Sequence, residues 1–314
     1  MYHDIIITML TIFGIFLILL TLPFIPSFFE LKRPRDTKPL FIDLNYSKDV
    51  RYFGKSFRNI IGKTIEVLGI SEENLDSDQI FEVNIKRDEK EKLEFSIKEE
   101  YIPESLEINH IVVAKNLKTK PFTTFNKEIY VRGNAKIGPF NTIRAIAVDG
   151  NLDLGRGTRI IRWADALGDV KVNDNCSLGL SLTSERSISL GRRVTFKRLF
   201  GKPVILASGF SKKRKREEIR NEINGSVKID GRINLDMEEG LIINGNIFAE
   251  GDVSLRGDIE VNGDIFSQRK VILDGVKIGD EGKIKSVIGA EGVVLKSNIL
   301  IYGQVLTEGI GKTE

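Results

Sequence analysis

The stretch that decides the fold runs from Glu239 to Asp274 and reads EGLIIN, GNIFAE, GDVSLR, GDIEVN, GDIFSQ, RKVILD, a six-residue unit repeated six times. The third and fifth places of each unit are nearly always apolar, and side chains two residues apart face the same side of a β-strand. Gly followed by Asp or Asn opens four of the units, a pair that suits a tight corner. Every unit is therefore predicted to contain one short strand and one corner. The predicted inward residues are Leu241, Ile243, Ile247, Ala249, Val253, Leu255, Ile259, Val261, Ile265, Ser267, Val271 and Leu273.

A unit with two inward side chains cannot bury them alone, so it must stack on copies of itself. The segment NGNIFAEGDVSLRGDIEV from Asn244 matches NGDIFSQRKVILDGVKIG from Asn262, which gives a second period of 18 residues, or three units. This pattern predicts a mainly β chain that forms a parallel β-helix with three faces. Six-residue periodicity leaves the handedness of the coil open.

The same pattern extends the predicted β-helix over residues 127–308, with a short tail at 309–314. It is interrupted at RWADAL from Arg162 and by a charged insertion at residues 208–224, which contains KKRKREEIRNEI. The run KKRKR would suit nucleic acid or lipid headgroups, but because Glu217 and Glu218 directly follow it, we expect a solvated loop or short helix there. A net charge of +3 likewise gives no reason to expect a nucleic-acid partner.

Residues Ile5 to Leu22 form an apolar run without a charged side chain (IIITMLTIFGIFLILLTL), and a helix of about 18 to 20 such residues spans a bilayer. No basic residue precedes the run and no small-residue cleavage site follows it, which favours an anchor over a buried core helix or a signal peptide. The basic flank after the run contains Lys32, Arg33, Arg35 and Lys38. Because basic flanks stay in the cytoplasm, we expect residues 1–38 to anchor the chain in the cell membrane once, with its bulk in the cytoplasm.

Residues 39–126 are rich in charge and poor in the six-residue pattern, and we expect a small α+β junction module there. RYFGKSFRNIIGKTIEVLGI from Arg51 has apolar residues at helical spacing, which predicts an amphipathic helix with a solvated basic face. IFEVNIKRDEKEKLEFSI from Ile80 alternates on both sides of a charged turn, which predicts a hairpin. Such a module could cover the first turn of the coil, whose backbone and apolar side chains would otherwise be exposed.

Residues that could carry catalysis are sparse. The two histidines are His3, ahead of the apolar run, and His110, ahead of the regular coil, so no histidine of the repeat can act as a general base. Cys176, the single cysteine, falls at an inward place of the repeat and suits a reducing compartment. No metal-binding spacing of Cys and His and no phosphate-binding loop occurs, so we expect no metal, cofactor or nucleotide.

The alternative hypothesis is an enzyme whose active site lies on a lateral face of the coil. The coil carries several aspartates that an acidic, polysaccharide-cleaving groove would need, and they are Asp149, Asp153, Asp165, Asp169 and Asp174. Three of them fall at or next to corners, where Asp is a common turn residue, whereas Asp153 lies in mid-strand and points outward. The alternative site for a glycan or nucleotide-sugar substrate would combine Asp153, Lys171 and Arg159.

The repeat INGNIFAEGDVSLRGDIEVNGDIFSQRKVILDG from Ile243 resembles the core repeat of bactofilins, the polymer-forming cytoskeletal proteins of bacteria. The resemblance is good over residues 225–308 and looser over 127–206. It implies a right-handed, three-faced β-helix that assembles without nucleotide on the cytoplasmic face of the inner membrane. The predicted membrane span, the junction module and the long insertion depart from the compact rods of that family.

These observations together predict a membrane-anchored scaffold that is not an enzyme. The last turn, SNILIYGQVLTE from Ser297, is followed by the short polar segment GIGKTE, so we expect an open coil end that pairs with a second copy. The residues predicted for this contact are Ile299, Ile301, Val305 and Leu306. A dimer results if the junction module blocks the other end, and a filament results if it does not. Membrane lipid and an envelope-synthesis protein are the other expected partners.

Overall fold

The computed structural model describes residues 2–22, 49–70, 75–86, 89–206 and 221–314. The chain divides into two units, Met1–Asp49 and Val50–Glu314. The first unit contains helix α1 (Tyr2–Thr21). In the part of the chain that the structure describes, no helix is long and apolar enough to cross a membrane, so the predicted transmembrane helix is unsupported. The predicted basic flank, Lys32 to Lys38, lies outside the described residues.

Most of the second unit is a parallel β-helix in two arms. The N-terminal arm comprises β3 (Glu107–Ile108), β4 (Ile111–Ala114), β5 (Leu117–Lys118), β6 (Thr124–Val131), β7 (Ala135–Ile137), β8 (Thr142–Val148), β9 (Leu152–Leu154), β10 (Arg159–Ala166), β11 (Val170–Val172), β12 (Ser181–Ser184), β13 (Ile188–Leu190) and β14 (Thr195–Leu206). Parallel ladders such as β4–β6–β8–β10–β12–β14 and β5–β7–β9–β11–β13–β14 form its faces. The coil thus starts at β3, upstream of the predicted start at residue 127.

The C-terminal arm comprises β15 (Asn221–Asn224), β16 (Val227–Ile229), β17 (Ile233–Asn244), β18 (Ile247–Ala249), β19 (Val253–Val261), β20 (Ile265–Ser267), β21 (Lys270–Ile278), β22 (Lys285–Gly289), β23 (Gly292–Leu295) and β24 (Ile299–Thr313). Its faces are the parallel ladders β15–β17–β19–β21–β24, β16–β18–β20–β22–β24 and β17–β19–β21–β23–β24. Strand β15 lies inside the predicted insertion, and the KKRKR run lies outside the described residues.

The predicted inward positions of the central repeat are confirmed. All twelve side chains, from Leu241 to Leu273, are buried, and all except Ser267 belong to one hydrophobic core that continues through both arms. Val253, for example, lies in register between Ile233 of the turn on one side and Val271 of the turn on the other. Like residues therefore stack along the axis, which is what a three-unit turn requires. Cys176 is also buried, as its inward place predicts.

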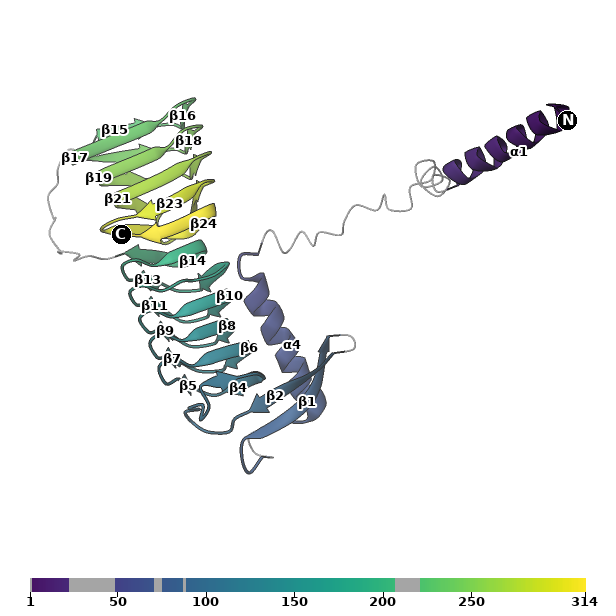
Figure 1. Cartoon of the computed structure of the whole chain (residues 1–314). Coiled ribbons are helices and arrows are strands. Elements are labelled where there is room, and N and C mark those ends of the chain that lie inside the picture. The colour runs from purple at the N-terminus through teal and green to yellow at the C-terminus, as the bar shows by residue number, and fades with distance from the viewer. Residues whose placement is uncertain (1, 23–48, 71–74, 87–88, 207–220) are drawn as a thin grey trace. The chain divides into compact units, whose positions relative to one another are not determined.

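The two arms meet through their ends (Figure 1). Strand β24, the last turn of the C-terminal arm, pairs antiparallel with β14, the last turn of the N-terminal arm, from Leu206↔Ile299 to Thr195↔Lys312. Within each arm the strands are parallel, so this reversal means that the C-terminal arm winds back toward β14 from a far end at β15. Figure 1 shows β14 beside β24, with β15 and β16 at the opposite end of the C-terminal arm.

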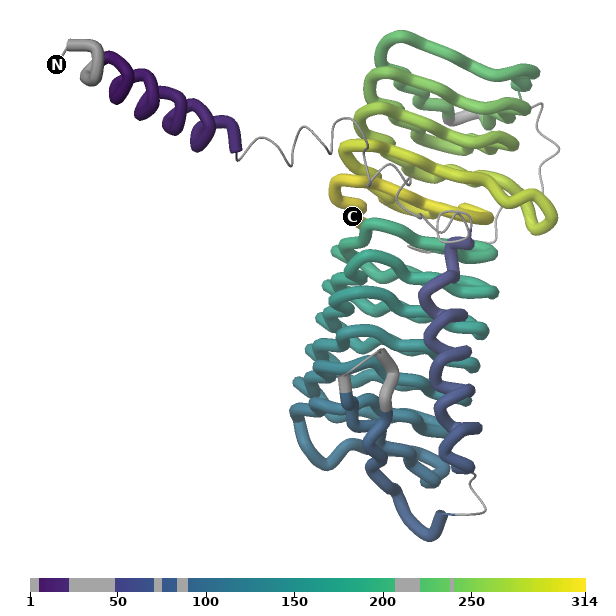
Figure 2. Tube along the Cα trace, turned by 90° about the vertical axis from the view of Figure 1, so that its right-hand side faces the viewer, coloured from purple at the N-terminus to yellow at the C-terminus, as the bar shows by residue number. Residues whose placement is uncertain are grey.

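The predicted helix and hairpin of the junction module are confirmed as α4 (Tyr52–Leu68) and the antiparallel pair β1 (Gln79–Lys86) and β2 (Glu89–Phe95). Strand β2 extends the face of β4 by parallel pairing. Helix α4 lies along the turns of the N-terminal arm, as Figure 2 shows, and Phe57 packs edge to face on Trp163 of β10. The expected interruption at RWADAL is not found: its third and fifth places, Ala164 and Ala166, lie in the core in register with Ile146 and Val148, while its outward Trp163 is buried by the module.

Candidate functional sites at the coil ends, beneath helix α4 and along one face

The residues predicted for self-association do not lie at an open end. Ile299, Ile301, Val305 and Leu306 belong to β24, where they pair with Leu206, Val204, Leu199 and Arg198 of the same chain. The first three are fully buried. The prediction was wrong because the short polar tail does not decide whether the last turn is covered: the N-terminal arm covers it, and the tail continues β24 as far as Thr313.

The free end of the C-terminal arm is its first turn, β15 and β16. In the described part of the chain, β15 pairs only with β17 and β16 only with β18, so each strand leaves one edge unpaired. Ile223 and Ile229, at inward places of this turn, are 38% and 39% exposed, whereas their register partners Ile243 and Ala249 are 0% and 3% exposed. The terminal turn therefore presents core side chains and backbone groups that every inner turn buries.

The other coil end is covered on one face. Strand β2 pairs with β4 there, and Leu93 and Phe95 pack with Ile111 and Val113 in the cluster beneath α4. This arrangement agrees with the expectation that the junction module covers the first turn. The two ends of the β-helix consequently differ: one carries an α+β module, and the other has strand edges that no described residue pairs with.

A buried ion network fixes α4 to the coil. Arg51 donates through Nε and Nη2 to both carboxylate oxygens of Asp165 at 2.7 Å, and its Nη1 contacts Glu185. Arg58 donates to Asp149 at 2.6 Å and also contacts Asp165. Both Arg51 and Asp165 are buried, so each charge depends on the other for compensation.

This network was not predicted, because the basic face of the helix was expected to be solvated. A hint was present in RWADAL, whose outward places carry Trp163 and Asp165 while its inward places, Ala164 and Ala166, keep the apolar pattern. Asp149 also accepts the hydroxyl of Tyr130 at 2.7 Å. Burial and this hydrogen bond raise the pKa of Tyr130 to about 12. Asp149 and Asp165 are thus occupied by structural contacts with the module.

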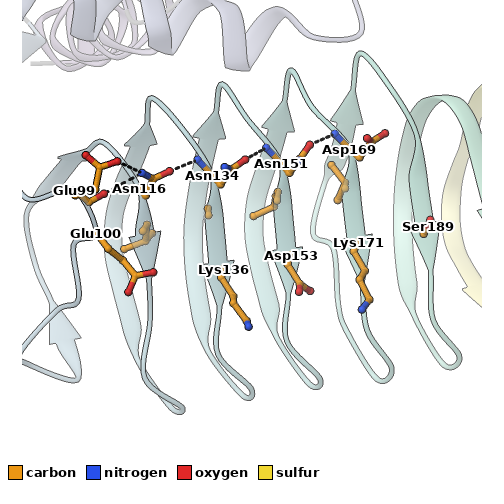
Figure 3. A pocket seen from close by; sticks show the side chains of 14 residues that line it. Glu99, Glu100, Asn116, Asn134, Lys136, Asn151, Asp153, Asp169, Lys171 and Ser189 are labelled. Carbon is orange, nitrogen blue, oxygen red and sulfur yellow. Dashed lines mark hydrogen bonds between the residues drawn. The ribbon is translucent and has the colours of Figure 1, made fainter.

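A shallow lateral groove of about 790 Å³ runs along the face formed by β5, β7, β9, β11 and β13 (Figure 3). A ladder of corner side chains borders it: Asn116, Asn134 and Asn151 each accept the backbone N–H of the residue stacked on them, at 2.8 to 2.9 Å. The last of these donors is Asp169, whose carboxylate accepts from Ser187 at 2.7 Å. Because these amides and this carboxylate hold the corners together, their first role is structural.

The structure brings together two of the three residues of the alternative enzyme site. Asp153 and Lys171 line the groove and lie in register on neighbouring strands, with Lys136 on the other side of Asp153. Figure 3 shows these three side chains directed to the same side of the coil. Arg159 belongs to the ladder of β3, β6, β8 and β10, on another face, and does not line the groove.

His110 and Cys176 are both held by local contacts. His110 Nε2 lies 2.5 Å from Glu94, which also accepts the Tyr101 hydroxyl at 2.7 Å. Burial raises the pKa of the Cys176 thiol to about 11, so the thiol stays protonated and unreactive at neutral pH. Across the described residues, no cluster of His, Cys, Asp and Glu could hold a metal ion.

The ladders, the shared core and the helix on one face define the class of this chain as a parallel β-solenoid protein. No protein-family model, curated protein or solved structure matches the chain. The class therefore rests on the geometry described above.

Proposed function

We propose that this chain is a non-enzymatic, bactofilin-like scaffold that associates with itself through its free coil end, without nucleotide or other cofactor, at the cytoplasmic face of the inner membrane. The observation that carries the proposal is the first turn of the C-terminal arm, which no described residue covers and in which Ile223 and Ile229 are more than one third exposed at inward positions. Burying the remaining exposed part of such a side chain stabilises a contact by about 1 kcal/mol, and pairing the free strand edges adds to it.

A second copy of this chain is the partner that the structure favours at the free coil end. The chain already joins two coil ends by antiparallel pairing of β14 with β24, so two turns of this β-helix fit against one another end to end. A contact between two β15–β16 ends would repeat that arrangement with a two-fold axis. Because the other end carries the α+β module, we expect association to stop at a dimer.

The membrane part of the proposal is supported by helix α1, whose apolar side chains are exposed from Ile6 to Leu20. Fractionation of cells into membrane and soluble proteins tests it, and recovery of the full chain in the soluble fraction would contradict it. An envelope-synthesis protein is the further partner that such a location suggests.

Sedimentation velocity of the full chain in detergent tests the end contact. We expect a dimer for the native chain and a monomer for Ile229→Asp, which places a charge at the free end. Ser254→Asp is the control, since Ser254 faces outward on an inner strand, and it should remain dimeric. A native chain that is monomeric at high concentration, or an Ile229→Asp variant that associates like the native chain, would refute the proposal.

A glycan-binding or glycan-cleaving protein is the second candidate, and the lateral groove with Asp153 and Lys171 is the observation that favours it. Binding of soluble oligosaccharides, measured by calorimetry on the native chain and on Asp153→Asn, distinguishes the two candidates. The scaffold proposal expects no binding by either form.

A further inference from the structure

One corner line of the N-terminal arm carries an exposed pair of aromatic rings. Phe122 and Phe140 occupy the same place on successive turns, and their rings stack with centroids 5.3 Å apart and an interplanar angle of 11°. The two side chains are 65% and 50% exposed. The preceding corner, residues 102–106, exposes Ile102 and Leu106 as well. Large apolar side chains therefore gather where the coil turns toward solvent.

The backbone at this pair is strained. Phe122 and Phe140 have φ angles of 61° and 58°, in the left-handed region that Gly and Asn adopt far more readily than an aromatic residue. The equivalent places on the next two turns are Gly157 and Asn175, which suit that conformation. Residues that adopt this conformation with little strain therefore fit this place in the repeat, yet Phe122 and Phe140 occupy it on two turns. Strain of this kind combined with exposure points to a role outside the fold.

Cations lie along the same corner line as the rings. Lys120 is on the turn of Phe122, Arg156 is on the turn after Phe140, and Arg192 and Arg193 share the turn two further on; all four are exposed. In the described part of the chain none of them forms an ion pair. The acids along this line include Glu104 on the preceding corner, Asp174, whose carboxylate accepts the backbone N–H of Arg192 at 2.8 Å, and Glu314, which follows the Thr313 carbonyl that accepts the backbone N–H of Arg193. Exposed aromatic rings beside unpaired cations form a surface with the chemistry of interfacial membrane binding.

We propose that this basic aromatic corner, Phe122 and Phe140 with Lys120, Arg156, Arg192 and Arg193, docks the β-helix lengthwise onto an anionic lipid surface. The rings enter the interface between headgroups and acyl chains, and the cations face the headgroups. Anionic lipid accounts for the rings and the cations together, whereas an apolar protein pocket would account for the rings alone. The lipid contact does not involve the β15–β16 end. The lipid proposal and the proposal of end-to-end association can therefore be tested separately.

Fluorescence quenching by brominated phospholipids tests the proposal on the full chain. The variant Phe122→Trp places a probe at the corner, while the native tryptophan, Trp163, is buried beneath Phe57 and supplies the background. Vesicles of brominated phosphatidylglycerol and phosphatidylcholine should quench the probe, and added salt should reduce the effect. The matched control is Phe248→Trp, an exposed position on the C-terminal arm, which should not be quenched.

Two results would overturn the proposal. The first is unquenched emission from Phe122→Trp in protein that sediments with the vesicles. That result would favour an apolar pocket of a partner protein as the binding site for the rings. The second is equal quenching after Arg156→Gln and Arg192→Gln are added to the probe variant.

A stability measurement checks that the rings are not needed by the coil. The double variant Phe122→Asn with Phe140→Asn should melt at the same temperature as the native chain or higher, because Asn adopts the left-handed conformation with less strain. A lower melting temperature would assign the rings a structural role and contradict the argument from strain.

Discussion

Two glycines of helix α4 offer a sharp test of the ion network. A Cβ atom added at Gly54 would lie 2.5 Å from Cβ and Cγ of Asp165, inside the buried pair with Arg51, whereas a Cβ atom at Gly62 meets nothing within 4 Å. Gly62 lies in the interior of the helix and Gly54 in its first turn, so the gain in helix propensity on changing to Ala is no larger at Gly54 than at Gly62. The variants Gly54→Ala and Gly62→Ala therefore differ in the contact with Asp165.

The expected changes in the free energy of unfolding follow from helix propensity and from the contact with Asp165. Replacing Gly by Ala within a helix stabilises by about 1 kcal/mol, which is the whole effect expected at Gly62. At Gly54 the methyl group displaces the Asp165 carboxylate, which Arg51 holds at 2.7 Å and which Thr183 also contacts at 2.5 Å. Breaking a buried ion pair costs about 3 to 5 kcal/mol. We therefore expect Gly54→Ala to lower the free energy of unfolding by about 2 to 4 kcal/mol.

Urea unfolding followed by tryptophan fluorescence measures the difference, because Trp163 is the single tryptophan and lies beneath Phe57 of α4. The transition should move to lower urea for Gly54→Ala and to higher urea for Gly62→Ala. Equal shifts in the two variants would refute the reasoning, since they would show that α4 does not pack closely on Asp165.

Two further predictions concern the coil. Val253→Asp places a carboxylate between Ile233 and Val271 and should destabilise the chain by several kcal/mol, measured by chemical unfolding. Ser254→Asp, at an outward place, should be nearly neutral. Similar losses of stability in the two variants would contradict the inward assignment of Val253. The hydrogen bonds from the side chain and backbone of Ser187 lower the pKa of Asp169 below 3.8. Their contribution to the free energy of unfolding is therefore present above pH 3.8 and is lost as the pH falls through the lower pKa of the folded state. Ser187→Ala should move the pKa of Asp169 up, measured by NMR titration, and an unchanged value would exclude the hydroxyl as the cause.

The six-residue repeat by itself determined the class of fold and the inward residues. Each unit needs only local features, two apolar residues two places apart and a corner that accepts Gly, Asp or Asn, so the pattern can be read without knowing where the unit lies. The amphipathic helix and the hairpin of residues 51–95 were predictable for the same reason, since their periodicities are local.

The way the coil ends was decided only in the tertiary structure. Every strand of the repeat has the same pattern, so nothing local distinguishes a strand that is covered by β14 from one that is free. The pairing of Leu206 with Ile299 and the ion pair of Arg51 with Asp165 join residues far apart in sequence, and both replace surfaces expected to face water or a second copy. A contact of that kind depends on how the whole arms meet, which is why the free end proved to be β15 and β16 rather than the last turn.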